Sequence, residues 1–259
     1  MREPCVHIGH QKVISTAVEQ AVASGGEAWV FTFHPHPAKI LSPETAPPLI
    51  STEPCRLRQF EARGKFQSLE KLCGEHGITA TAVPPVLFNG ERISSTHVRQ
   101  AVQAGDIPLA EKMLGRPFSI FGTVVNGHGV GRGLGFPTAN IAPENELIPA
   151  PGVYAAYTRI QRTEDGEQKQ LRHPSSGLPS AVFIGERKTF SDHEPVIEAY
   201  LLDFDGDLYG QQIEACLVKK IRDAEPFPSK EALIEQIKKD VAQIRGMLNQ
   251  PSWSSLQKK

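Results

Sequence analysis

Between residues 118 and 218, segments typical of β-strands follow one another with no helical segment between them. They combine β-branched residues with apolar alternation, and they lie at 118–125, 152–160, 180–184, 196–204 and 211–218. Turn residues separate the segments, and Asp205-Gly206 is a pair typical of a tight hairpin. A series of strands without crossover helices favours a closed antiparallel barrel. After it we expect a helix that begins at Ser229, as its N-cap, with an apolar face formed by Leu233, Ile234, Ile237, Val241 and Ile244.

The N-terminal half has the pattern of an α/β domain. A helix is expected to end at Ser24-Gly25-Gly26 and to bury the face formed by Val13, Ile14, Ala17, Val18, Ala21 and Val22. A buried strand over 28–33 follows, then helices over 97–104 and 109–114, the last ending at Gly115. The first strand of a βαβ unit should precede His7, where only six residues lie. We therefore divide the chain into a shortened α/β domain (1–115), a barrel domain (116–248) and a polar tail (249–259).

Composition excludes several classes of protein. The chain has 28 Lys and Arg residues against 29 Asp and Glu residues, a formal charge of −1, so it lacks the basic excess of proteins that coat nucleic acid or anionic membranes. No apolar stretch approaches the length of a membrane span or of a signal peptide's apolar core. The four cysteines form no C-x-x-C pair, which is typical of reduced thiols. We expect a cytoplasmic protein that binds neither nucleic acid nor membrane.

A run with glycine at every second position from 127 to 135 is the strongest candidate for a nucleotide site. Backbone amides of such a flap can close over phosphates, and its candidate residues are Gly127, Gly129, Gly131, Arg132, Gly135 and Pro137. Thr138 and Asn140 follow on an extended segment, where residues two apart point the same way. They offer two neutral oxygens to Mg²⁺. A glycine-rich edge strand alone does not explain five glycines followed by Phe-Pro-Thr-Ala-Asn.

Two N-terminal motifs are candidate phosphate sites. His7 and His10 flank Gly9 at a helix start, and Ser94, Ser95 and Thr96 precede a helix that carries Arg99. Plain surface histidines and a plain helix cap are the alternatives. His34 and His36 alternate with two prolines at the end of the expected strand. Together with His7 and His10 they make four histidines that could gather around zinc. No cysteine or carboxylate is spaced to complete such a site, and zinc is the poorer interpretation.

The C-terminal half resembles the bacterial bifunctional riboflavin kinase/FMN adenylyltransferases, also called FAD synthetases. The matching stretches are GRPFSIFGTVVNGHGVGRGLGFPTANI, PGVYAA, IEAYLLDFDGDLYG and LIEQIKKDVAQIR, in the family's order. The resemblance implies a six-stranded antiparallel barrel that transfers the ATP γ-phosphate to the riboflavin 5′-hydroxyl. It implies that Thr138 and Asn140 bind Mg-ATP, that Glu198 is the catalytic base and that Arg222 lies beside the flavin. From the strand pattern alone, Glu198 is an ordinary exposed residue. In FIGERKTF, Phe183, Glu186 and Lys188 replace the Asn, Thr and Pro of the family's usual NIGTRPTF.

The N-terminal half resembles the adenylyltransferase of the same family, a Rossmann-like nucleotidyltransferase domain. HIGH, TFHPHP and ISSTHVR match its nucleotide signatures, which implies that His7, His10, His36, Ser94, Ser95, Thr96 and Arg99 bind nucleotide. The strand and the glycine-bearing turn that precede the HIGH motif in the family are absent, and Glu3-Pro4-Cys5 stands where the family has an Asp-Gly approach. The chain also passes over the family's strands and loop that shape the flavin pocket, between Arg63 and Gly64. We expect riboflavin kinase activity with weak or absent conversion of FMN to FAD. The alternatives are a fully bifunctional enzyme and a non-catalytic flavin- or nucleotide-binding protein.

Overall fold

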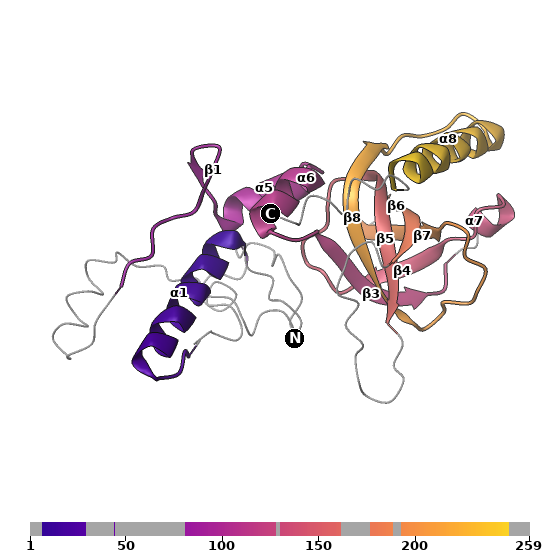
Figure 1. The fold of residues 1–259 in the computed structure, drawn as a ribbon. Helices are drawn as coiled ribbons and strands as arrows, with labels where there is room; N and C mark the ends of the chain where they lie inside the picture. The colour runs from indigo at the N-terminus through magenta and orange to yellow at the C-terminus, as the bar shows by residue number, and fades with distance from the viewer. Residues whose placement is uncertain are drawn as a thin grey trace.

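Figure 1 shows the fold, taken from a computed structural model that describes residues 7–29, 44, 81–127, 130–161, 177–188 and 193–248. Six strands form a closed barrel with the order β3-β4-β7-β6-β5-β8, and every neighbouring pair is antiparallel. The strands are β3 (Ser119–Val125), β4 (Ala139–Pro143), β5 (Gly152–Gln161), β6 (Leu178–Lys188), β7 (His193–Leu201) and β8 (Gln212–Asp223). The closed antiparallel barrel expected from the strand pattern is confirmed, and so are the six strands that the family resemblance implied.

The two faces of the barrel wall have different coverings. On each strand, every second side chain points into the barrel, and Tyr154 on β5, Val182 on β6 and Ile197 on β7 belong to one hydrophobic cluster there. Their neighbours on β5, including Val153 and Tyr157, face outward and pack with the last helix, α8 (Lys230–Leu248). As expected, Ser229 caps this helix, because its Oγ accepts the Ala232 backbone N–H at 3.2 Å. In Figure 1, α8 lies on the outside of the barrel.

Two helices that precede the barrel share its core. The helices are α5 (Ser95–Gln103), whose N-cap Ser94 accepts the His97 N–H at 3.3 Å, and α6 (Ile107–Leu114). Gly115 ends α6 with a φ of 69°, a left-handed conformation that glycine adopts without strain. The buried residues of both helices, with Phe118, belong to the hydrophobic cluster of the barrel interior. The cluster therefore runs continuously across residue 115.

The first helix, α1 (Ile8–Ser24), differs from expectation in its burial. It ends at Gly25, which is left-handed as expected with a φ of 67°. The prediction of a buried face is wrong, since no residue of α1 is buried and Val22 is 75% exposed. Contacts of α1 with the later helices come from its first turn, where Gln11 Nε2 donates to the Leu114 carbonyl at 2.9 Å. No described element covers the remaining turns.

A short hairpin before α5 was not expected. Strand β1 (Leu87–Phe88) pairs with β2 (Glu91–Arg92) through Asn89 and Gly90, whose φ values of 52° and 82° are typical of a tight hairpin turn. Most of the strand expected over 28–33, and all of 45–80, lie outside the described residues, and residues 28 and 29 have no regular structure. Among the described helices, none combines the length and apolar character needed to cross a membrane.

Ile107 tests whether the helical pair stabilises the barrel. The Ile107→Ala variant removes a fully buried side chain from the shared cluster, and we expect it to lower the free energy of unfolding of the barrel by about 2–5 kcal/mol. Chemical denaturation followed by circular dichroism measures the loss. Leu87→Ala, at a position 57% exposed, is the control and should change stability by less than about 0.5 kcal/mol. Equal stability of the two variants would contradict the shared core.

Candidate functional site

Strand register places the candidate base beside the candidate metal ligands. On β7, Glu198 is the direct cross-strand partner of Asn140 on β4. Residues directly opposite in an antiparallel pair have their side chains on the same face. Ile197 and Ala199, on either side of Glu198, point into the barrel interior, so Glu198 and Asn140 face outward. The carboxylate and the amide therefore lie next to one another on the outer wall.

Thr138 joins this pair through a hydrogen bond. Its Oγ1 donates to Glu198 Oε2 at 3.3 Å, and all three side chains are half-buried. The structure thus brings together Thr138, Asn140 and Glu198, which the resemblance assigned to one site. Two neutral oxygen donors and one carboxylate within a few ångströms are a set of groups that suits a hard divalent cation and a proton-accepting step.

The glycine-rich flap lies so close to these side chains that two of its glycines have no room for a Cβ. A Cβ on Gly127 would overlap the Asn140 side-chain amide, and one on Gly131 would lie 2.9 Å from Thr138 Oγ1. Gly131 belongs to α7 (Val130–Gly133), a single helical turn where the sequence had predicted only a flexible flap. Gly135, with a φ of 86°, reverses the chain after it. Gly129 and the side chain of Arg132 lie outside the described residues, and Pro137 is exposed.

An aromatic contact fixes the end of the flap. The Phe136 ring meets the Tyr200 ring edge to face, with centroids 5.5 Å apart and planes at 83°. Tyr200 is two residues beyond Glu198 on β7 and lies on the same outer face. The chain that carries Thr138 is therefore anchored to the strand that carries the carboxylate.

A groove opens between the flap and the start of α8. It has a volume of about 570 Å³, and its lining residues are Gly133, Leu134, Phe227, Ser229, Lys230 and Leu233. Its walls are apolar at Leu134, Phe227 and Leu233, with a lysine beside them. Such a lining offers a ligand apolar contacts and one positive charge.

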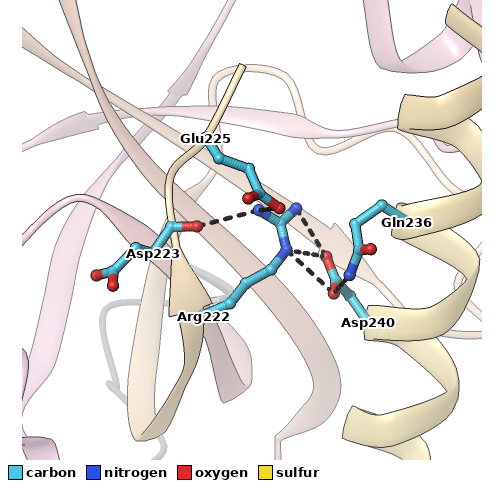
Figure 2. Close-up of polar contacts among 5 residues, drawn as sticks. All are labelled: Arg222, Asp223, Glu225, Gln236 and Asp240. Atoms are coloured by element: carbon cyan, nitrogen blue, oxygen red, sulfur yellow. Dashed lines mark hydrogen bonds and ion pairs between the residues drawn. The ribbon is translucent and has the colours of Figure 1, made fainter. Parts of the chain in front are cut away.

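Arg222, the residue expected beside the flavin, is held by an ion pair with α8 (Figure 2). Its Nε donates to Asp240 Oδ2 at 2.9 Å, and its Nη2 forms an ion pair with the same oxygen at 2.9 Å. Gln236 Nε2 donates to Asp240 Oδ1 at 2.8 Å. The guanidinium also lies over the Phe227 ring, 5.3 Å from its centroid. Arg222 thereby connects β8, α8 and one wall of the groove.

Sequence analysis missed Asp240, which is only 4% exposed. A signal was present, because Asp240 lies between Ile237 and Val241 on the face expected to be apolar. A carboxylate at such a position needs a partner, since an unpaired buried charge is costly.

The two N-terminal motifs begin helices that lie next to one another. A Cβ on Gly9 would be 4.0 Å from the Ile93 carbonyl oxygen, directly before Ser94. His7 is 8% exposed and its ring lies 3.9 Å from that of His10, centroid to centroid. Ser94 caps α5, Ser95 begins it, and Thr96 and Arg99 follow in its first turns. His34 and His36 lie outside the described residues. Among the residues that the structure describes, no group of three His, Cys, Asp or Glu side chains could hold a metal.

Cys216 on β8 is a free thiol buried in the barrel wall. Burial, reinforced by the negative charge of Glu214, raises the pKa of this thiol to about 12. It stays protonated at neutral pH, so it is no candidate nucleophile.

Comparisons with known proteins show which families the two parts of the chain match. The riboflavin kinase family matches residues 114–248, and the FAD synthetase family matches residues 5–64. The bifunctional riboflavin kinase/FMN adenylyltransferase of Pseudomonas fluorescens is 32% identical over 291 residues, which cover 93% of this chain and 89% of that protein. The enzyme of the same name from Escherichia coli K12 is 40% identical over 177 residues, 68% of this chain and about half (53%) of that protein.

A solved structure shares the fold. The crystal structure of a protein named macrolide-efflux protein, from Streptococcus pneumoniae, superposes with a TM-score of 0.59 at 33% identity, over 68% of this chain and 54% of that one. The alignment with the Pseudomonas fluorescens protein, at 291 positions, is longer than this chain of 259 residues. That protein therefore has residues within the aligned region that this chain lacks.

Gly127 tests the contact between flap and site. The Gly127→Ala variant would push the Asn140 side chain away from its position beside the flap. Overpacking typically costs about 1–3 kcal/mol, and where this cost falls on the bound state we expect Mg-ATP to bind roughly 5-fold to 150-fold more weakly. Isothermal titration calorimetry measures the affinity. Gly246→Ala on α8, outside the flap, is the matched control, because a Cβ there meets nothing within 4 Å. Equal affinities in both variants would disprove the close approach.

Asp240 tests the Arg222 ion pair. Asp240→Ala leaves the guanidinium without its main partner, and breaking such a pair costs roughly 3–5 kcal/mol of unfolding free energy when both groups are buried. Because the Arg222 side chain is 18% exposed, we expect the lower end of this range. Thermal denaturation gives the change. Glu235→Ala breaks the exposed pair with Lys239 on the same helix and should leave stability nearly unchanged.

Proposed function

Because this chain belongs to the bifunctional riboflavin kinase/FMN adenylyltransferase family, we propose that its barrel transfers the γ-phosphate of ATP to the 5′-hydroxyl of riboflavin and releases FMN. The observation that supports this reaction most directly is the convergence of Thr138, Asn140 and Glu198 beside the glycine flap. ATP is a cytoplasmic metabolite, and we place the enzyme in the cytoplasm. The riboflavin kinase domain spans residues 114–248.

In the proposed reaction, Glu198 accepts the proton of the attacking hydroxyl. Its Oε2 atom accepts the Thr138 hydroxyl hydrogen bond, so the carboxylate is oriented before substrate arrives. Its outward position on β7 leaves it open to a hydroxyl held over the barrel wall. Phosphoryl transfer requires little from the protein beyond positioning and charge stabilisation. A base already oriented in this way needs no rearrangement when the hydroxyl arrives.

Thr138 and Asn140 fit a magnesium ion bound with ATP. Mg²⁺ prefers oxygen ligands and usually keeps several waters, so one hydroxyl and one amide oxygen from the protein are sufficient when phosphates complete the set. The missing Cβ of Gly127 leaves the room that the Asn140 side-chain amide occupies. When bound, the ion would neutralise the negative charge that develops on the phosphates. Flap backbone amides at 127–135 would contact the same phosphates.

We further propose that conversion of FMN to FAD is weak in this chain. Support comes from the aligned residues that the Pseudomonas fluorescens enzyme has and this chain lacks. Residual nucleotide binding is supported by the positions of His7 and Ser94, which lie at the starts of the adjacent helices α1 and α5. A fully bifunctional enzyme is the second candidate, and its product distinguishes it from a kinase alone.

Product analysis tests both proposals in one experiment. The purified chain is incubated with riboflavin and Mg-ATP, and the flavins are separated by chromatography. FMN without FAD is the expected result. Riboflavin left unchanged would overturn the kinase assignment, and FAD formed at a rate similar to that of FMN would overturn the proposed loss of adenylyl transfer.

Replacing Glu198 tests its role as base. Glu198→Gln keeps the size and the hydrogen-bonding oxygen but cannot accept the proton, so we expect kcat to fall by roughly 10²–10⁴-fold with little change in stability. Steady-state kinetics of FMN formation measures the loss. Glu235→Gln, at an exposed position of α8, is the matched control and should behave as the unmodified enzyme. A Glu198→Gln enzyme with unchanged kcat would exclude this role.

A further inference from the structure

The outer wall of the barrel carries an aromatic side chain directly beside the candidate base. Glu198 pairs with Asn140 on one side and with Phe183 on the other, so these three residues form one row across β4, β7 and β6. Neighbouring strands lie roughly 4.8 Å apart, which makes Phe183 an immediate neighbour of the carboxylate. Phe183 is 37% exposed, although it is apolar.

The position of the Phe183 ring is constrained by the chain beneath it. Gly185 is two residues further along β6 on the same face, and a Cβ there would lie 2.7 Å from the ring. On its other side, Phe183 pairs with Val153 of β5, which is buried with Ile244 of α8. The ring therefore lies at the place where the outer wall passes from the open site to the part covered by α8.

The two sides of Glu198 are chemically different. Thr138 and Asn140, the oxygen ligands, lie on the β4 side, whereas the β6 side offers the apolar ring of Phe183. Attacking and leaving oxygens are roughly in line in phosphoryl transfer, so acceptor and nucleotide approach from opposite directions. With the phosphates over β4, the acceptor lies over β6.

We infer that Phe183 is a substrate-contacting residue that binds the planar, apolar part of the flavin and sets the affinity of the enzyme for its acceptor. This inference rests on the proposed kinase function. An aromatic ring favours a flat conjugated ligand through offset stacking or edge contact. It offers nothing to the charged phosphates of ATP, so its contribution is specific to one of the two substrates.

Three variants test the inference by separating the two substrates. Phe183→Ala removes the ring and Gly185→Ala displaces it, and both should raise KM for riboflavin about 3-fold to 12-fold while KM for ATP and kcat stay within about twofold. Phe183→Tyr keeps a ring and should restore the KM for riboflavin. Trp29→Ala removes another exposed aromatic side chain, outside the barrel, and should leave both KM values unchanged.

Equilibrium dialysis of riboflavin against each variant, without ATP, gives the second readout, and thermal denaturation establishes that each variant is folded. Weaker riboflavin binding by Phe183→Ala supports the inference even in the absence of turnover. If the unmodified chain forms FMN while folded Phe183→Ala keeps the same KM and dissociation constant for riboflavin, the inference fails and the kinase function stands. An equal rise in KM for both substrates, or a loss of kcat alone, also overturns it. If the unmodified chain forms no FMN, the proposed function fails independently.

Discussion

The pairing register of β4, β7 and β6 is the constraint on which the candidate site depends. Because side chains alternate between the two faces of a strand, a slip of one residue would move Glu198 into the interior and bring Ile197 or Ala199 to the surface. The apolar interior prevents that slip, since it would expose buried side chains and bury a carboxylate. The same residues that form the core thus determine which polar groups meet on the outer wall.

Local signals were sufficient to predict much of this arrangement. The strand pattern predicted five of the six barrel strands, all but β4, and capping chemistry predicted the helix boundaries at Ser229, Gly115 and Gly25. The two-residue spacing of Thr138 and Asn140 placed both on one side of an extended segment, where the structure has them beside Glu198. Each of these inferences depends on residues within a few positions of one another. The family resemblance supplied the link to Glu198, which its own strand pattern did not single out.

What the sequence could not reveal depends on distant segments. Arg222 can pair with Asp240 only because α8 packs beside β8 in the folded chain. The row that includes Phe183 follows from the order of the strands in the barrel. The exposure of α1 could not be foreseen either, because periodicity shows that a helix has an apolar face but not what covers it. Asn89-Gly90 is the exception, since this dipeptide, between Leu87-Phe88 and Glu91-Arg92, is by itself a hairpin signal.

The continuous core formed by α5, α6 and the barrel has a consequence for how such a chain can diverge. Residues 93–113 precede the riboflavin kinase match, yet their buried side chains belong to the same hydrophobic cluster as the barrel interior. Selection for kinase activity alone is therefore sufficient to preserve them, whatever becomes of adenylyl transfer. In a lineage that dispenses with FAD formation, drift can erode the sequence upstream of Ile93, whereas Val98, Ile107 and Leu114 stay under purifying selection. The presence of α5 and α6 in a chain therefore does not indicate that the chain still converts FMN to FAD.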